Sequence, residues 1–260
     1  MAGMSTFDEL VAEGELVDVS TWGAGFLVGR TVEEAPPWRY RDLVAPYLAG
    51  ADTLLDMGTG DGSALLDLAP LPPRTVAVEE WAPTIPAAVA TLRPAGVPLV
   101  RCRGSVENTD PPPAADHPTL PFRDATFDVV ANRHDCFDPA DVRRVLRPGG
   151  VFVTQQVGGR HGDEVRARLG LPPGDAAPWD MSVATAQLES AGLTVVGSGE
   201  AHPRLSWTDI GAFVAYVRSV PWYVPDFSVS AYRERLRELS ESGAMATGLH
   251  MFWVAARCAT

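Results

Sequence analysis

The segment Leu54-Leu55-Asp56-Met57-Gly58-Thr59-Gly60-Asp61-Gly62 places an apolar run directly before three alternating glycines. The apolar run predicts a short buried strand, and Ser63 opens a helical pattern that continues to Leu68. Glycine has no Cβ atom, so the backbone between these elements can turn sharply and come close to a ligand. A strand, a glycine turn and a helix in this order predict a nucleotide pocket at the carboxyl end of a parallel strand.

The spacing of the glycines indicates which nucleotide would bind. A dinucleotide site needs G-x-G-x-x-G/A, and its last small position would fall on Ser63, whereas this chain has G-x-G-x-G. The pattern therefore favours a nucleoside over a pyrophosphate. A second predicted strand, Thr75–Val78, ends in Glu79, 21 residues after Gly58. An acidic side chain there can accept hydrogen bonds from both ribose hydroxyls, and Trp81 could lie against an adenine ring.

These residues resemble motifs I and II of the class I S-adenosylmethionine-dependent methyltransferases, in particular the methyltransferase type 11-like domain. Leu120–Val130 is similar to the family's LPFxDxSFDxV entry into the fourth strand, and Arg144–Val153 to its RVLRPGGxF turn into the fifth. The resemblance covers roughly residues 50–157. It implies an α/β fold with a doubly wound, seven-stranded, mostly parallel sheet, a C-terminal antiparallel hairpin and a helical insertion that forms a cap.

The resemblance also implies S-adenosyl-L-methionine as cofactor and S-adenosyl-L-homocysteine as product. The glycines would shape the turn against the methionine part and the ribose, Asp56 would hold the amino group and Glu79 the ribose. Ser105 stands where the family commonly has an aspartate facing adenine, so that adenine would rely more on the Val106 amide and Trp81. The cofactor-binding residues predicted in this way are Asp56, Gly58, Thr59, Gly60, Gly62, Glu79, Glu80, Trp81, Ser105, Val106 and Asn132.

The residues after the fourth and fifth predicted strands are the candidates for the methyl acceptor. His134 is the candidate general base because its ordinary pKa lies near neutrality; alternatively it hydrogen-bonds the backbone and shapes the wall. Gln155 and Gln156 would grip a polar acceptor or cap a strand edge. Aromatic residues between 207 and 223 would form a lid or belong to the core. The predicted substrate residues are Arg133, His134, Gln155, Gln156, Trp222 and Tyr223.

Two glycines and two polar residues, Gly158-Gly159-Arg160-His161, predict a loop after the fifth strand, either beside the cleft with His161 as a spare base or on the surface. The sequence predicts helices over 208–220 and 230–240 and a closing strand over 249–256. We expect one Rossmann-like domain over 1–260, divided into an N-terminal helical segment (1–50), a cofactor-binding core (51–205), a helical and aromatic insertion (206–245) and a closing strand (246–260).

The composition narrows the choice of partner. The 260 residues include 33 acidic and 21 basic ones, a net charge of −12, which disfavours a nucleic acid. Three scattered cysteines without C-x-x-C spacing predict neither a disulfide framework nor a metal site. With no signal-peptide pattern and no apolar run long enough for a membrane span, we expect a cytoplasmic protein. The sequence leaves the oligomeric state open.

These observations predict methyl transfer by in-line displacement to a small, uncharged or cationic, natural-product-like acceptor in secondary metabolism. Three alternatives stay open at this point. The acceptor could be a guanine base of ribosomal RNA, the protein could bind the cofactor without catalysis, or the donor could undergo another reaction such as cyclisation.

Overall fold

A computed structural model describes residues 6–19, 24–105, 107–109, 120–174 and 179–260. The chain divides into two compact units. The Rossmann-like unit consists of the described residues of 37–158, 178–201 and 251–260, and the second unit of those of 1–36, 159–177 and 202–250. The grouping of all segments into a single domain stays a prediction.

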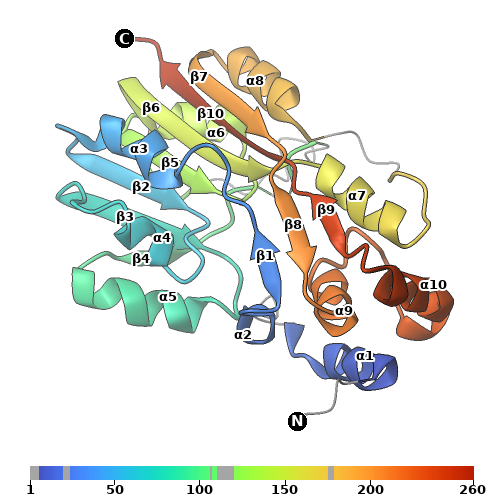
Figure 1. The fold of residues 1–260 in the computed structure, drawn as a ribbon. Helices are drawn as coiled ribbons and strands as arrows, with labels where there is room; N and C mark the ends of the chain where they lie inside the picture. The colour runs from blue at the N-terminus through green and yellow to red at the C-terminus, as the bar shows by residue number, and fades with distance from the viewer. Residues whose placement is uncertain (1–5, 20–23, 106, 110–119, 175–178) are drawn as a thin grey trace. The chain divides into compact units, whose positions relative to one another are not determined.

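A seven-stranded sheet in the order β4-β3-β2-β5-β6-β10-β7 forms the centre of the Rossmann-like unit (Figure 1). The strands from β4 to β6 run parallel, and β10 is antiparallel to both of its neighbours. The predicted fold class is thereby confirmed. The strands are β2 (Thr53–Met57), β3 (Arg74–Glu79), β4 (Leu99–Arg101), β5 (Phe127–Arg133), β6 (Leu146–Val157), β7 (Leu193–Ala201) and β10 (Met251–Cys258).

Helices cover both faces of this sheet because its strands are apolar on both sides. Successive residues of β2 show this: Leu54 belongs to the core under α3, α4 and α5, and Leu55 to the core under α6 and α8. Within the described residues, no helix has both the length and the apolar character needed to cross a membrane. The helices are α3 (Tyr40–Leu48), α4 (Ser63–Leu66), α5 (Ile85–Leu92) with a 3₁₀ turn at Arg93–Ala95, α6 (Pro139–Val145) and α8 (Met181–Ser190).

Side-chain caps set where several of these helices begin. Asp180 accepts hydrogen bonds from the Ser182 and Val183 amides at the start of α8, and Asp138 accepts one from Ala140 at the start of α6. Such caps satisfy amides that have no partner within the helix. The caps therefore fix the helix starts locally.

The second unit is a three-stranded antiparallel sheet, ordered β1-β8-β9, with five helices among its described residues. Its helices α9 and α10 match the two predicted ones. The prediction of a loop at 158–161 is wrong, because α7 begins at Arg160, and the three short strands were not predicted. The elements are α1 (Phe7–Leu16), α2 (Ala24–Leu27), β1 (Thr31–Glu33), α7 (Arg160–Arg168), β8 (Arg204–Trp207), α9 (Ile210–Ser219), α10 (Val229–Ser242) and β9 (Ala246–Gly248).

Helices α1 and α9 cross at two glycines. A Cβ atom on Gly14 would overlap the carbonyl oxygen of Gly211, and one on Gly211 would overlap that of Leu10. Backbone atoms cannot move aside as a flexible side chain would. The small residues therefore permit the close helix contact in this unit.

We expect Gly211→Val to lower the free energy of unfolding by about 3 kcal/mol, because overpacking at a rigid contact forces the two helices apart. Urea unfolding followed by circular dichroism measures the loss. Gly25→Ala is the control, since Gly25 lies in α2 with nothing within 4 Å of its added Cβ. Equal stability of Gly211→Val and the wild type would contradict the assigned helix contact.

Candidate functional site

The glycine turn after β2 has one open face. Gly58 (φ +66°) and Gly60 (φ +60°) both have left-handed backbone conformations that favour glycine. A Cβ atom on Gly58 would overlap the Asp135 side chain, and one on Gly62 would lie 2.7 Å from Cγ of Leu92. A Cβ atom on Gly60 would meet no atom of the described residues within 4 Å. Of the three predicted glycines, only the middle one thus leaves room for a ligand to approach the backbone.

The carboxylate of Glu79 lies against this turn. Its Oε2 atom accepts a hydrogen bond from the Gly60 amide at 2.7 Å, and its Oε1 atom accepts bonds from the amides of Glu80 (2.9 Å) and Trp81 (2.8 Å). Glu79 is buried, whereas 49% of Trp81 is exposed. The backbone thereby holds the carboxylate in place: Oε1 already accepts two bonds, and Oε2 keeps one lone pair for a further donor.

Three carboxyl groups gather at the carboxyl ends of β2, β3 and β5. Burial, together with the charge of Glu79, raises the pKa of Asp56 and of Asp135 to about 7 each. The nearby Thr59 hydroxyl and the charge of Arg133 oppose the rise of the Asp56 pKa. Carboxyl groups that are costly to ionise together are suited to a cationic ligand, which would compensate their charge.

Three buried polar atoms beside the cluster have no hydrogen-bond partner among the described residues: Oη of Tyr40, Oγ1 of Thr59 and Nδ2 of Asn132. The Oδ1 atom of Asn132 accepts bonds from Thr154 Oγ1 (2.8 Å) and Gln156 Nε2 (2.7 Å), which fixes the direction of its amide. Tyr40 lies close enough to Asp56 for that charge to raise its pKa, in addition to the effect of burial. Unpartnered buried groups are uncommon and indicate a place for a polar ligand.

His134 is held by a chain of hydrogen bonds. Nε1 of Trp38 donates to Oε1 of Gln155 at 2.9 Å, so the amide nitrogen of Gln155 faces Nε2 of His134 at 3.0 Å. Because that nitrogen can only donate, we infer that Nε2 of His134 accepts and that its proton is on Nδ1. Partial burial and the Arg133 charge both lower the pKa of His134 below its ordinary value near 6.5, although the residue as a whole is exposed. His134 is therefore neutral at pH 7.

Residues 55–154 match a family model described as a methyltransferase domain. This segment is a methyltransferase domain of the class I, S-adenosylmethionine-dependent kind. Among curated proteins, none matches the sequence.

Solved structures share the fold of the methyltransferase domain at low sequence identity. A protein from Bacillus halodurans C-125 is 17% identical, with a TM-score of 0.60, covering 85% of this chain and 99% of that one. The [4+2]-cyclase SpnF is 17% identical, with a TM-score of 0.57, covering 98% and 97%. The YcgJ protein of a Bacillus species is 15% identical, with a TM-score of 0.55, covering 85% and 98%. These likenesses concern the fold.

Other predicted residues of the methyltransferase domain are engaged with the protein itself. Ser105 is buried and its hydroxyl donates to the Glu107 carbonyl at 2.9 Å. Glu80 forms an ion pair with Arg103. Gln156 is buried, and its amide nitrogen also donates to the Asp135 carbonyl and to Thr154 Oγ1. The amide nitrogens of both predicted glutamines are thus used inside the domain, and their roles toward an acceptor stay predictions.

The remaining predicted positions lie outside this cluster or outside the described residues. Val106 lies outside the described residues. Trp222, 57% exposed, and Tyr223, half-buried, belong to the second unit, and their assignment to the acceptor stays a prediction. His161 is fully buried, with Nδ1 2.9 Å from the Gly248 carbonyl and Nε2 2.6 Å from the Tyr216 hydroxyl. It is not a loop histidine.

Three residues of the Rossmann-like unit belong to this site without being among the predicted site residues. Asp135 directly follows His134, so its place after the fourth strand was available as a signal, but its contact with Gly58 was not. Tyr40 and Trp38 come from the segment before β2, where no motif marks them. Only the folded chain brings them to the ends of β2 and β6.

The two glycines of the turn should respond differently to alanine. We expect Gly58→Ala to lower the free energy of unfolding by more than 3 kcal/mol, because the new methyl group overlaps Asp135 at a left-handed φ. Gly60→Ala should cost only the backbone strain, about 1–2 kcal/mol, yet weaken binding of S-adenosylhomocysteine at least tenfold. Urea unfolding and calorimetry separate the two effects. Unchanged binding by Gly60→Ala would show that the open face is not where the nucleoside lies.

Proposed function

We propose that this methyltransferase domain transfers a methyl group to a small, uncharged or cationic acceptor. The observation that carries the proposal is the open Gly60 face bordered by the carboxyl groups of Asp56, Glu79 and Asp135. When bound, S-adenosylmethionine supplies a sulfonium methyl group that is already activated for displacement. The open backbone, the carboxyl cluster and the unpartnered Tyr40 hydroxyl are suited to a ligand that carries positive charge and polar groups.

The protein's own part in such a reaction is binding and orientation. Glu79 would accept hydrogen bonds from the ribose hydroxyls, and Asp56 and Asp135 would compensate the positive charge. Holding two reactants in line can supply roughly 7–11 kcal/mol of the barrier without any proton transfer. A base is needed only where the acceptor atom carries its proton into the reaction.

His134 is the residue that we propose as this base. It is neutral, as a base must be, but its Nε2 lone pair already accepts a bond from Gln155. Acting as a base would therefore require Gln155 to release that nitrogen. The hydrogen bond from Trp38 to Oε1 of Gln155 keeps the amide nitrogen of Gln155 directed at His134. These two hydrogen bonds would therefore tune the basicity of His134.

The acidity of the chain supports an uncharged or cationic small molecule over a nucleic acid. A net charge of −12 repels a polyanion, and RNA-binding proteins rely on basic surfaces. The fold alone leaves the chemistry open, since the similar SpnF is a [4+2]-cyclase. The proposal of a natural-product-like acceptor rests on this charge argument.

Two measurements test the proposal in order. Calorimetry with S-adenosylmethionine and S-adenosylhomocysteine should show saturable binding of both, and no binding of either would refute it. Transfer of labelled methyl groups is then measured on a panel of small amines and phenols and on total ribosomal RNA. Transfer to RNA alone would replace the small-molecule acceptor, and binding without any transfer would favour a non-catalytic role.

His134→Gln and His134→Ala address the base directly once a small acceptor is methylated. We expect the turnover number to fall about 100-fold with an unchanged dissociation constant for S-adenosylhomocysteine, since general-base catalysis contributes about 10²–10⁴-fold. An unchanged turnover number would assign His134 to the wall of the site.

A further inference from the structure

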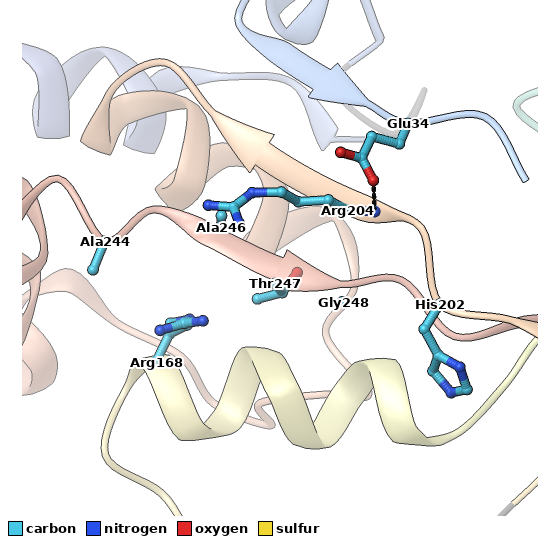
Figure 2. A pocket seen from close by; sticks show the side chains of 8 residues that line it. All are labelled: Glu34, Arg168, His202, Arg204, Ala244, Ala246, Thr247 and Gly248. Carbon is cyan, nitrogen blue, oxygen red and sulfur yellow. Dashed lines mark hydrogen bonds between the residues drawn. The ribbon is translucent and has the colours of Figure 1, made fainter.

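The second unit contains a hollow of about 520 Å³ beside β9, the edge strand of its small sheet (Figure 2). Besides His202, three side chains with hydrogen-bond donors border it: Arg168 at the end of α7, Arg204 at the start of β8 and Thr247 in the middle of β9. Figure 2 shows Arg168 rising from α7 toward β9. The residues that line the hollow are Glu34, Arg168, His202, Arg204, Ala244, Ala246, Thr247 and Gly248.

Two of these side chains have buried polar atoms without a partner. Nε of Arg168 and Oγ1 of Thr247 accept or donate no hydrogen bond among the described residues. Thr247 is 3% exposed, so its hydroxyl has little access to bulk water. A buried polar group left unpaired costs about 1–3 kcal/mol, and more when it is charged. Two such groups at one hollow indicate that a ligand supplies the missing partner.

The arginines of the hollow differ from those on α10. Arg233 and Arg235 form ion pairs with Asp8 and Glu238, whereas the guanidinium groups of Arg168 and Arg204 form none within the described part of the chain. The chain holds 33 acidic residues for 21 basic ones, so acidic partners are abundant. Arginines that form no ion pair in a protein with so many acidic residues indicate that their partner is an anion of another molecule.

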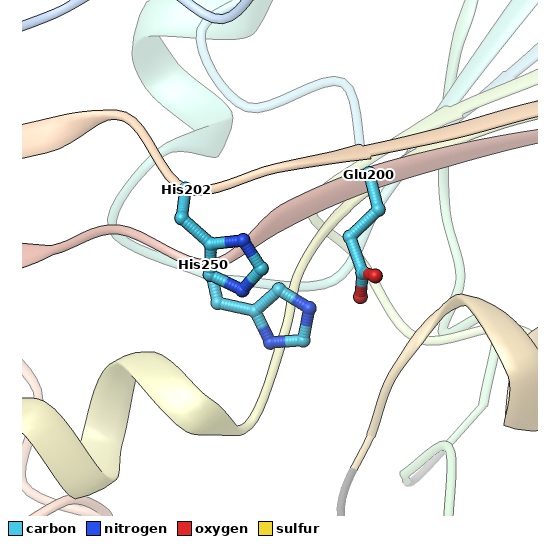
Figure 3. Close-up of side chains that lie close together, drawn as sticks. All are labelled: Glu200, His202 and His250. Carbon is cyan, nitrogen blue, oxygen red and sulfur yellow. The ribbon is translucent and has the colours of Figure 1, made fainter.

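Glu34, the acidic residue that lines the hollow, is not the anionic partner of these arginines. Oε2 of Glu34 accepts a hydrogen bond from the backbone amide of Arg204 at 3.0 Å (Figure 2). Glu34 is thus held by the backbone of β8 rather than by a guanidinium group. The ring of His202 stacks on that of His250, with centroids 4.8 Å apart (Figure 3). Figure 3 also draws Glu200, which belongs to the Rossmann-like unit.

We propose that this hollow binds the oxyanion group, a carboxylate or a phosphate, of a small molecule. The planar fork of an arginine matches two oxygens of either group, and the threonine hydroxyl adds a further donor. Arg168 and Thr247 would contact the anion directly. Arg204, which is exposed, would cover the anion on its solvent side. The inference is independent of the methyl donor, which binds the other unit under the proposed function.

Calorimetry of the full chain with inorganic phosphate and with malonate, at an ionic strength matched with chloride, tests the inference. We expect saturable binding of at least one anion; tighter phosphate binding identifies a phosphate ligand, and tighter malonate binding a carboxylate ligand. Arg168→Met and Thr247→Val should each weaken it about tenfold or more, because each removes a hydrogen bond to a charged group. Arg160→Met, an exposed arginine at the other end of α7, should bind as the wild type.

Two outcomes would overturn the inference. One is the absence of saturable binding of both anions by the wild type; the other is unchanged affinity in Arg168→Met, Arg204→Met and Thr247→Val. Thr247→Val keeps the shape of the side chain, so its affinity for the anion tests the inference even if Arg168→Met does not fold. Binding of S-adenosylhomocysteine by the same samples reports on the Rossmann-like unit, so failure of the methyl-donor proposal and failure of this one remain distinguishable.

Discussion

Glu79→Ala is expected to weaken binding of S-adenosylhomocysteine about 100-fold or more. A charge-assisted hydrogen bond from the ribose to Oε2 would be lost, at about 1.5–3 kcal/mol. The same substitution removes the acceptor for the Gly60, Glu80 and Trp81 amides, so the turn itself loses its support. Calorimetry gives the dissociation constant, and thermal unfolding with and without ligand shows how far the loss is structural.

Glu189→Ala is the matched control. It removes one negative charge from the exposed last turn of α8, so any effect of net charge alone appears there as well. Glu79→Gln keeps the volume of the side chain but replaces one acceptor with a donor, and we expect it to bind more weakly than the wild type too. Wild-type affinity in Glu79→Gln and Glu79→Ala would separate Glu79 from the nucleoside and remove the basis of the proposed donor site.

Binding of the methyl donor should tighten as the pH rises from 6 to 8. Asp56 and Asp135, with pKa values of about 7, are mostly protonated at pH 6 and mostly ionised at pH 8. A cationic ligand favours the ionised forms, so each group contributes up to about tenfold over this range. Calorimetry with S-adenosylmethionine at a series of pH values, in buffers of different ionisation enthalpy, measures both the affinity and the protons released.

Substitution of the acids should flatten this dependence. Asp56→Asn and Asp135→Asn each remove one titrating group, whereas Glu189→Gln should leave the slope unchanged. In Glu79→Ala the residual binding should reach its plateau at a lower pH, because the charge of Glu79 raises both pKa values. Affinity that is flat from pH 6 to 8 in the wild type would contradict the role of the carboxyl cluster.

The stability of the ligand-free protein should change with pH in the opposite sense. The raised pKa values mean that the folded state favours protonated Asp56 and Asp135, so their contribution is complete below their ordinary pKa near 4. It is lost as the pH rises through about 7. The stabilising effect of the bound donor should therefore be larger at pH 8 than at pH 6.

The central sheet could be predicted from the sequence because its signals are local. The apolar run at β2 occupies 53–57 as expected, and the glycines stop it abruptly. Glu79 lies at the turn because neighbouring parallel strands end at the same edge of a sheet. The two long helices α9 and α10 are periodic over 10 and 14 residues, which suffices for recognition.

The small sheet and helix α7 of the second unit escaped prediction for a physical reason. Its strands β1, β8 and β9 are three or four residues long, too short for an alternating pattern, and their pairing partners come from distant parts of the chain. Helix α7 follows two glycines, contains a third (Gly162) and has few apolar residues, so no apolar periodicity marks it, although its Arg, Glu and Ala residues favour a helix. Packing against the rest of its unit, with His161 fully buried, stabilises this helix.

The sequence by itself determined that a carboxylate and a glycine turn meet at the head of a parallel sheet, since short-range spacing and strand direction suffice for that. Only the tertiary structure decided which glycine stays open, that Asp135 joins the acids, and that Gln155 turns inward to Trp38, 117 positions away. Such choices depend on contacts between side chains that are remote in the chain. No local pattern encodes those contacts, because packing selects among many partners at once.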